Sequence, residues 1–283
     1  MSEIKIHILH TGDVRVSPYL PFGGNCNIIK AMGLTTPHEQ WLWLPVFCYL
    51  VEHPQGRILV DTGWSRTMSP AGRYDRPAQI RSLGSPLLYM CNQGVLPAGQ
   101  SVAEQLQRMG LKDSDLDYVL LTHLDCDHAN GLNEVAHAKH ILCSAAELRF
   151  ATHIGIVNRV RYQPRWWRDT TLQTFEWNGT EGPANHSFDL FGDGSMVLIN
   201  IPGHSDGLCA VRIRNTQGQF VLLCADGGYA RRSWEKMITS GIATDREAQL
   251  QSLQWIREQS LLPNCMGVYA SHDTEVTPHV IEL

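Results

Sequence analysis

The sequence has 283 residues, a net charge of −5 at pH 7, 43% hydrophobic residues and 18% charged residues. A chain of this length can bury a large core, and this charge gives no overall attraction to nucleic acid or to an anionic membrane. The longest apolar stretch, residues 41–51, contains Pro45 and is well short of the roughly 20 residues that a membrane span needs. The start of the chain lacks the pattern of a signal peptide, so we expect a cytoplasmic globular protein with no nucleic-acid or membrane partner.

The first part of the chain predicts strands joined by a hairpin. Residues 4–9 alternate apolar and polar side chains, as a half-exposed strand does. The apolar runs 44–51 and 57–60 flank a turn-like segment at 53–56, which predicts a β-hairpin. Asp61 follows the second of these strands, so its carboxylate either fixes the turn or orients a metal-bound histidine.

Residues 69–100 are rich in proline and glycine and contain one short apolar patch at 86–90. This composition is typical of an insertion rather than of the scaffold, and such a segment covers a site or forms a homodimer contact. After it, Ser101 and Glu104 have the spacing of a capping box at the start of a helix that Gly110 ends.

A dense group of metal-capable side chains follows the buried strand that we expect at residues 118–121. Ligand sites of open α/β sheets lie at the carboxyl ends of strands, so this placement predicts a metal site. The alternative is a polar helix N-terminus whose histidines are hydrogen-bonded. The group has the spacing His-x-Asp-x-Asp-His and consists of His123, Asp125, Asp127 and His128.

The eight cysteines include no Cys-x-x-Cys pair, and most lie in apolar runs. We therefore expect buried free thiols in a reducing cytosol rather than disulfides. Cys126 lies between the candidate ligands, and we expect its side chain to point away from them into the core, with a redox-active thiol as the alternative.

Arginines and aromatic side chains alternate through residues 158–168. This pattern is found in surfaces that bind single-stranded nucleic acid, but also in lids and amphipathic packing segments. Because the chain has no wider basic character, the second interpretation is favoured. The aromatic side chains are then candidates for one wall of a substrate pocket.

Three later apolar runs, at 195–201, 219–224 and 266–270, each lead into a further candidate ligand. Together with the first group, they give too many ligands for one tetrahedral ion, and they suit two ions that share a carboxylate. Water held between two such ions ionises near pH ~7 and can attack a carbonyl or phosphoryl group, which is hydrolase chemistry. The three further candidates are His204, Asp226 and His272.

These motifs resemble those of the metallo-β-lactamase superfamily of binuclear hydrolases, in which His-x-His-x-Asp-His is followed by separate His, Asp and His ligands. Within this superfamily the likeness is to the N-acyl homoserine lactonases, and it covers nearly the whole chain. The segments that carry it are residues 44–52, 58–63, 202–205, 226–229 and 271–275.

The resemblance implies a single α/β domain over residues 1–283, folded as an αββα sandwich. It implies that hydroxide opens the lactone ring of a quorum-sensing signal, and that Asp127 and Tyr229 are the catalytic residues. Tyr229 would hydrogen-bond the substrate carbonyl or the leaving group. One metal would be held by His123, residue 125 and His204, the other by Asp127, His128 and His272, with Asp226 bridging the two.

One position departs from the family motif, because Asp125 stands where the second histidine is expected. A carboxylate makes the first metal site harder and, by about one unit, more negatively charged. We expect two divalent ions, with zinc favoured and iron or manganese as alternatives. The flavodiiron relatives also have an acid here, but the sequence ends eleven residues after His272, so we expect no flavin domain like theirs.

Three functions are therefore open. The first is opening of an acyl homoserine lactone or a similar lactone. The second keeps the fold and the metals but acts on another ester, a thioester or a phosphodiester, because fold does not fix function. The third is an iron-dependent redox or sensing protein.

Overall fold

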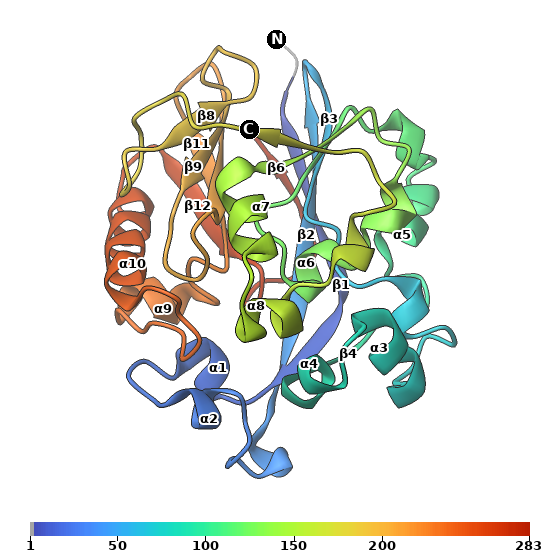
Figure 1. Ribbon diagram of the computed structural model, residues 1–283. Coiled ribbons are helices and arrows are strands. Elements are labelled where there is room, and N and C mark those ends of the chain that lie inside the picture. Colours follow the sequence, from blue (N-terminus) through green and yellow to red (C-terminus); the bar gives the residue numbers. More distant parts are fainter. Residues whose placement is uncertain (1–2) are drawn as a thin grey trace.

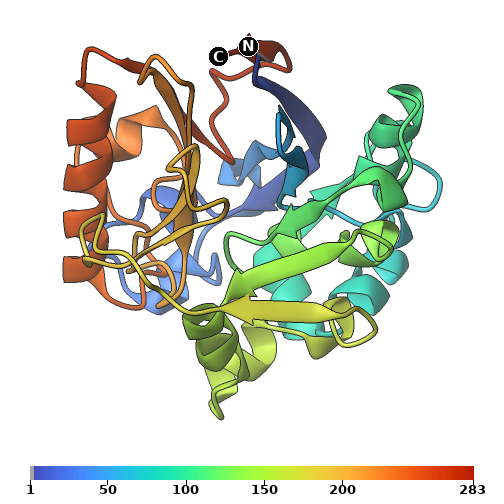
Figure 2. The ribbon, with the colours of Figure 1, turned by 90° about the horizontal axis from the view of Figure 1, so that it is seen from above.

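The computed structural model describes residues 3–283, which form two β-sheets packed face to face with helices on both outer faces (Figure 1). Seen from above, the long C-terminal helix α10 (Arg246–Ser260) covers the outer face of one sheet, and a group of shorter helices covers the outer face of the other (Figure 2). The αββα sandwich expected from the sequence is therefore confirmed.

The predicted hairpin is the centre of the larger, eight-stranded sheet. Its strands β2 (Leu42–His53) and β3 (Gly56–Val60) pair antiparallel, and β2 also pairs antiparallel with β1 (Lys5–Val16). Two parallel strands follow beside β3, so that the carboxyl ends of three strands meet at one edge. These are β5 (Tyr118–Leu120) and β6 (His140–Ser144), and the sheet is completed by β4 (Asn92–Val95), β7 (Leu172–Phe175) and β13 (Val280–Glu282).

The smaller sheet has five strands in the order β12-β11-β10-β9-β8. Every residue of its strand β11 (Phe220–Ala225) is buried, because one face of the strand packs on the larger sheet and the other on helices. Strand β11 pairs in parallel with β12 (Cys265–Ala270), and the other neighbouring strands of this sheet pair antiparallel. These remaining strands are β8 (Ser187–Asp189), β9 (Met196–Asn200) and β10 (Cys209–Arg214).

The core between the two sheets is apolar and tightly closed. Ile6 and Val60 of the larger sheet pack in one cluster with Leu198 and Val211 of the smaller sheet, and all four are fully buried. A second cluster joins the smaller sheet to α10, which contributes buried residues such as Leu253. Burial of this apolar surface fixes the two sheets against each other, and so fixes the loops at their shared edge.

Helix α5 (Val102–Arg108) begins and ends as the sequence predicts. The Ser101 hydroxyl accepts a hydrogen bond from the Glu104 backbone, and the Glu104 carboxylate accepts one from the Ser101 backbone. Gly110 then adopts a φ of 74°, which glycine tolerates and most other residues do not.

Residues 69–100 contain two helices and strand β4, which pairs with β1. Leu83 and Leu88 from this segment are buried in the core cluster on the outer face of the larger sheet. Its description as an insertion, the homodimer contact and the single-domain boundary all stay predictions. The two helices are α3 (Arg76–Leu83) and α4 (Pro86–Cys91).

The other helices are short, and within residues 3–283 no helix combines the length and the apolar character needed to cross a membrane. They are α1 (Tyr19–Phe22), α2 (Ile28–Ala31), α6 (Cys126–Ala129), α7 (Ala145–Thr152), α8 (Ile156–Arg161) and α9 (Arg231–Glu235), with 3₁₀ turns at His38–Gln40, Arg66–Met68, Asp113–Asp115, Leu132–Val135 and Pro164–Trp166.

Candidate metal centre

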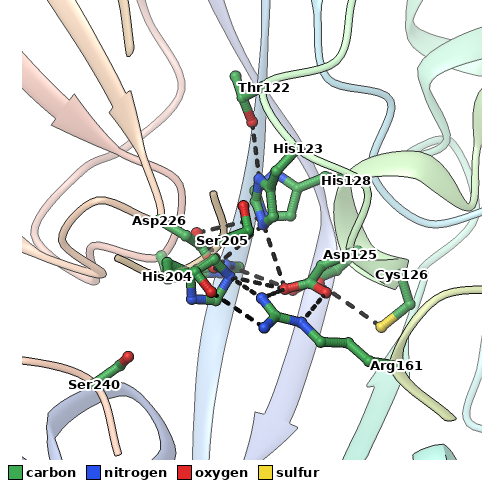
Figure 3. Close-up of polar contacts among 12 residues, drawn as sticks. Thr122, His123, Asp125, Cys126, His128, Arg161, His204, Ser205, Asp226 and Ser240 are labelled. Carbon is green, nitrogen blue, oxygen red and sulfur yellow. Dashed lines mark hydrogen bonds and ion pairs between the residues drawn. The ribbon is translucent and has the colours of Figure 1, made fainter. Parts of the chain in front are cut away.

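All seven predicted ligands come together where strands of both sheets end. Figure 3 labels His123, Asp125, His128, His204 and Asp226 among them. The ligand atoms of the seven form overlapping groups in which all atoms lie within 4.8 Å of one another. We call His123, Asp125 and His204 the first group, and Asp127, His128 and His272 the second group. His123 follows β5, Asp125 directly precedes α6, Asp127 and His128 lie in α6, and His204, Asp226 and His272 follow β9, β11 and β12.

Asp226 lies between the two groups. Its Oδ1 is 3.1 Å from Nε2 of His272 and 3.4 Å from Nε2 of His128. Its Oδ2 is 3.7 Å from Nε2 of His204 and 3.9 Å from Nε2 of His123. Ligands at about 2.0–2.1 Å from a tetrahedral ion lie about 3.3–3.4 Å apart, so these spacings fit two ions that share the carboxylate.

Several of these atoms are buried without any hydrogen-bond partner among the described residues. They are Nε2 of His123, His128 and His272, and Oδ1 of Asp226. Burying a polar atom without a hydrogen-bond partner costs folding free energy. So many such atoms at one point are best explained if they are metal ligands. The donor set of imidazole nitrogens and carboxylate oxygens therefore fits two divalent metals, with no choice among zinc, iron and manganese.

In the rings of His123, His128 and His272, Nε2 faces the candidate metal site, and the other nitrogen, Nδ1, is held by hydrogen bonds. Asp61 Oδ2 lies 2.8 Å from Nδ1 of His128, and it also accepts a hydrogen bond from the Thr122 hydroxyl at 2.8 Å. That hydroxyl is 3.0 Å from Nδ1 of His123, and Nδ1 of His272 donates to the carbonyl of Pro45 at 2.8 Å. Of the two roles left open by the sequence, Asp61 thus takes the one of orienting a candidate ligand histidine, and it also holds the backbone after β5 through Thr122.

Sequence reasoning missed Glu147. Its spacing from Ser144 predicts a capping box, and the Ser144 hydroxyl does accept a hydrogen bond from the Glu147 backbone at 3.0 Å. The fully buried carboxylate does not return to the cap, because it accepts hydrogen bonds from the Leu124 backbone at 3.0 Å and from the Ser205 hydroxyl at 2.6 Å. Glu147 therefore ties the loop that carries His123 to the loop that carries His204.

Arg161 was also missed, although it belongs to the arginine-rich segment. Its guanidinium forms two parallel hydrogen bonds with Asp125, Nε to Oδ1 at 2.6 Å and Nη2 to Oδ2 at 2.7 Å (Figure 3). Burial alone would raise the pKa of Asp125, but Arg161 and the neighbouring histidines hold that pKa well below its usual value. Asp125 therefore carries the negative charge that the sequence predicts, but the Arg161 guanidinium offsets it, a contribution that the sequence analysis did not include.

The aromatic residues of the same segment do not line the pocket as expected. Tyr162, Trp166 and Trp167 are buried in the core cluster behind the larger sheet, which favours the packing interpretation. Cys126 is buried in the same cluster, and its Sγ accepts a hydrogen bond from the Asn92 side chain at 3.2 Å. It does not point away from the candidate ligands as expected, because the thiol also donates to Oδ1 of Asp127 at 3.8 Å and the residue borders the cavity described below. Burial raises the pKa of this thiol well above its usual value, which keeps it unreactive.

A cavity of about 560 Å³ opens beside the metal-capable residues. Asp125, Asp127 and Tyr229 line its polar end, and the rest of the wall is mainly aliphatic, with residues such as Leu20 and Leu88. This is the size and composition of a site for a small molecule with one polar end.

The ring of Tyr229 stacks on that of His272, with centroids 5.2 Å apart. Burial, followed by the charge of Asp226, raises the pKa of Tyr229 well above its usual value. The phenol therefore stays protonated at neutral pH and keeps a proton to donate into the cavity.

A family model described as the metallo-beta-lactamase superfamily matches residues 41–263. The chain belongs to this superfamily. Among curated relatives, the N-acyl homoserine lactonase AttM of Rhizobium radiobacter is 23% identical over 266 residues, which cover 91% of this chain and 89% of the relative. The N-acyl homoserine lactonase of Bacillus cereus is 26% identical over 267 residues, covering 91% and 93%.

Solved structures share the fold. A crystal structure of an N-acyl homoserine lactone hydrolase with N-hexanoyl-L-homoserine bound at its catalytic metal centre is similar with a TM-score of 0.72 and 21% identity, covering 97% of this chain and 95% of that one. The dizinc quorum-quenching lactonase AidC is similar with a TM-score of 0.64 and 15% identity, covering 97% and 89%. Family membership and these relatives make this protein a metal-dependent hydrolase similar to lactonases.

Proposed function

We propose that the protein is a binuclear metal hydrolase that opens the lactone ring of N-acyl homoserine lactones or of similar lactones with an apolar tail. The observation that carries the proposal is the position of Asp226, whose two oxygens face two groups of histidine nitrogens at the polar end of an apolar cavity. Zinc is the proposed metal, and destruction of a quorum-sensing signal is the proposed role.

The proposed metal positions follow from the ligand geometry. The first ion would be held by His123, Asp125 and His204, the second by Asp127, His128 and His272, and both by Asp226. Two ions so placed would polarise the ester carbonyl and make water nucleophilic at neutral pH.

The protein's own groups orient the substrate and move its protons. Tyr229 borders the cavity and remains protonated, so its hydroxyl is placed to donate a hydrogen bond to the ester oxygen as negative charge develops there. Asp127 also borders the cavity, and its carboxylate is placed to hold the proton that the leaving alkoxide needs.

The apolar wall of the cavity favours an acyl tail over a nucleotide or a peptide. Val14, Met32 and Ile242 line it, and Arg161 is the single cationic side chain of the lining within residues 3–283. That guanidinium forms an ion pair with the Asp125 carboxylate, so it adds little net positive charge to the wall for a phosphate group to bind. A phosphodiester is therefore disfavoured relative to a carboxylic ester.

A substrate screen with metal analysis tests the proposal. The full chain, loaded with zinc and with its metal content measured, should open N-acyl homoserine lactones to the corresponding acids, each with a mass gain of one water. Acyl thioesters and phosphodiesters should react far more slowly. Protein with two bound zinc ions that hydrolyses a thioester or phosphodiester but no lactone would refute the substrate, and oxygen-sensitive visible absorption from bound iron would favour the redox alternative.

A further inference from the structure

Three atoms at the first group form a close triangle. Asp125 Oδ2 is 2.8 Å from Nε2 of His204, and Nη2 of Arg161 lies 2.7 Å from the first atom and 2.8 Å from the second. Nη1 of Arg161 also donates to the backbone carbonyl of His204 at 3.1 Å. The guanidinium is therefore held against the same two atoms that would ligate the first metal (Figure 3).

The charges of these atoms explain why the guanidinium lies there. In the tautomer that can ligate a metal through Nε2, His204 presents a lone pair at Nε2, and Asp125 Oδ2 presents another 2.8 Å away. Two lone pairs at this distance repel unless a positive group contacts both. Arg161 supplies that positive group, and a divalent metal would supply the same contact.

Within residues 3–283, no Arg or Lys side chain forms an ion pair or hydrogen bond with the side chains of the second group; Asp127 instead faces Nε2 of His272 at 3.5 Å. Nε2 of His128 and Nε2 of His272 lack hydrogen-bond partners among the residues described. Arg161 is itself well shielded, since only 13% of its side chain is exposed, and its guanidinium also lies over the Tyr162 ring. The two groups therefore differ in what an incoming metal must displace.

We propose that Arg161 competes with the first metal for Asp125 and His204, so that the two metals bind with unequal affinity and the first position is the weaker. The inference rests on the proposed two-metal centre. When metal is scarce, the second position fills first. The first position fills only when the Arg161 guanidinium releases Oδ2 of Asp125 and Nε2 of His204. Arg161 is thus a positioning residue that sets metal occupancy rather than a group that touches substrate.

Metal release from the full-length, zinc-loaded protein tests this. Wild-type protein is dialysed against buffers of graded free zinc, and bound zinc is measured by mass spectrometry. Two separated steps are expected. The weaker step is the binding step that needs the higher free zinc concentration. In Arg161→Met, which removes the guanidinium but keeps an unbranched side chain, the free zinc concentration at the midpoint of this step should fall at least tenfold.

Matched variants assign the steps. Arg159→Met changes an exposed arginine of the same helix and should leave both steps in place. His123→Ala removes a ligand of the first group and should lack the weaker step. Arg161→Lys keeps a charge without the planar fork, so its weaker step should move in the same direction by less, and it serves as the test if circular dichroism shows Arg161→Met to be misfolded.

The outcomes separate the two proposals. If two zinc ions bind but the weaker step stays in place in the Arg161 variants, or moves to higher free zinc, the competition is refuted and Arg161 merely orients Asp125. If neither wild-type protein nor any variant binds a second zinc ion, the two-metal centre itself fails.

Discussion

Asp61 Oδ2 lies 2.8 Å from Nδ1 of His128, while the other nitrogen of that ring faces Asp226. Through the Thr122 hydroxyl the same carboxylate also reaches His123. One buried acid therefore fixes the orientation of one histidine from each group.

Asp61→Asn should weaken zinc binding by roughly 10–100-fold. A neutral amide makes the His123 and His128 rings less basic as metal ligands and holds their orientation less firmly. The measurement is bound zinc after dialysis against graded free zinc. Asp117→Asn, which changes a partly exposed acid paired with Lys139 near the other end of the same strands, is the control. Unaltered zinc affinity in Asp61→Asn would mean that the acid only fixes the backbone.

Asp226→Ala should lose at least one of the two metals, because no other acid among the described residues lies between the two groups. Metal content after gel filtration measures the loss. Asp206→Ala removes an exposed carboxylate two residues from His204 and should retain full metal content. A fully occupied Asp226→Ala centre would refute the bridging role.

Tyr229→Phe should keep both metals and lower kcat by roughly 10²–10³, the usual effect of losing a hydrogen-bond donor to a developing oxyanion. Kinetics with a lactone substrate and metal analysis on the same sample measure both quantities. Tyr162→Phe is a matched control, because the Tyr162 hydroxyl is buried without a hydrogen-bond partner and removing it should cost nothing. A kcat that is equal in wild-type and Tyr229→Phe protein would remove Tyr229 from the mechanism.

Ile28→Ser should lower kcat/KM for long-chain lactones while leaving short-chain lactones almost unchanged. Ile28 is 56% exposed and lines the cavity, so a long tail would cover it. Each methylene group that the variant no longer buries weakens binding by ~0.8 kcal/mol, or roughly fourfold. Ile154→Ser, at an 80% exposed isoleucine that is not part of the lining, is the control. Equal losses for short and long tails would place the acyl chain elsewhere.

Glu147→Gln should raise the melting temperature at neutral pH. Burial raises the pKa of Glu147, so this group favours folding below its unfolded pKa of about 4.3 and loses that contribution as pH rises through the folded pKa. Glutamine can accept from Leu124 and donate to Ser205 without a buried charge. The gain should vanish near pH 4, whereas Glu147→Ala should be less stable at every pH. A Gln variant that is less stable at pH 7 would show that the carboxylate charge itself is needed.

The strands and the candidate ligands were predictable because local patterns encode them. The hairpin around residues 53–56, the capping box at Ser101 and the His-x-Asp-x-Asp-His spacing each lie within a few residues of sequence, and the structure places them as expected. The resemblance to the superfamily supplied the pairing of distant ligands such as His204 and His272, which no local pattern encodes.

Arg161 and Glu147 were not predictable, for a different reason. Arg161 contacts Asp125, 36 positions away, and Glu147 contacts Leu124, 23 positions away. Both contacts exist only after the sheets have packed. The local signal at Glu147 even favoured a capping box, because serine three residues earlier gives the same pattern whichever way the carboxylate turns. Tertiary contacts decided both side chains.

The pairing of Asp125 with Arg161 also limits the order in which this sequence could have changed. Mutation of Asp125 to histidine, which would restore the family motif, would leave a buried guanidinium beside two imidazoles, and breaking such a pair from one side typically costs roughly 3–5 kcal/mol. Loss of Arg161 first leaves a carboxylate that a metal can still neutralise. An evolutionary route between the two motifs should therefore pass through an intermediate that retains Asp125 and lacks Arg161, rather than through the reverse combination.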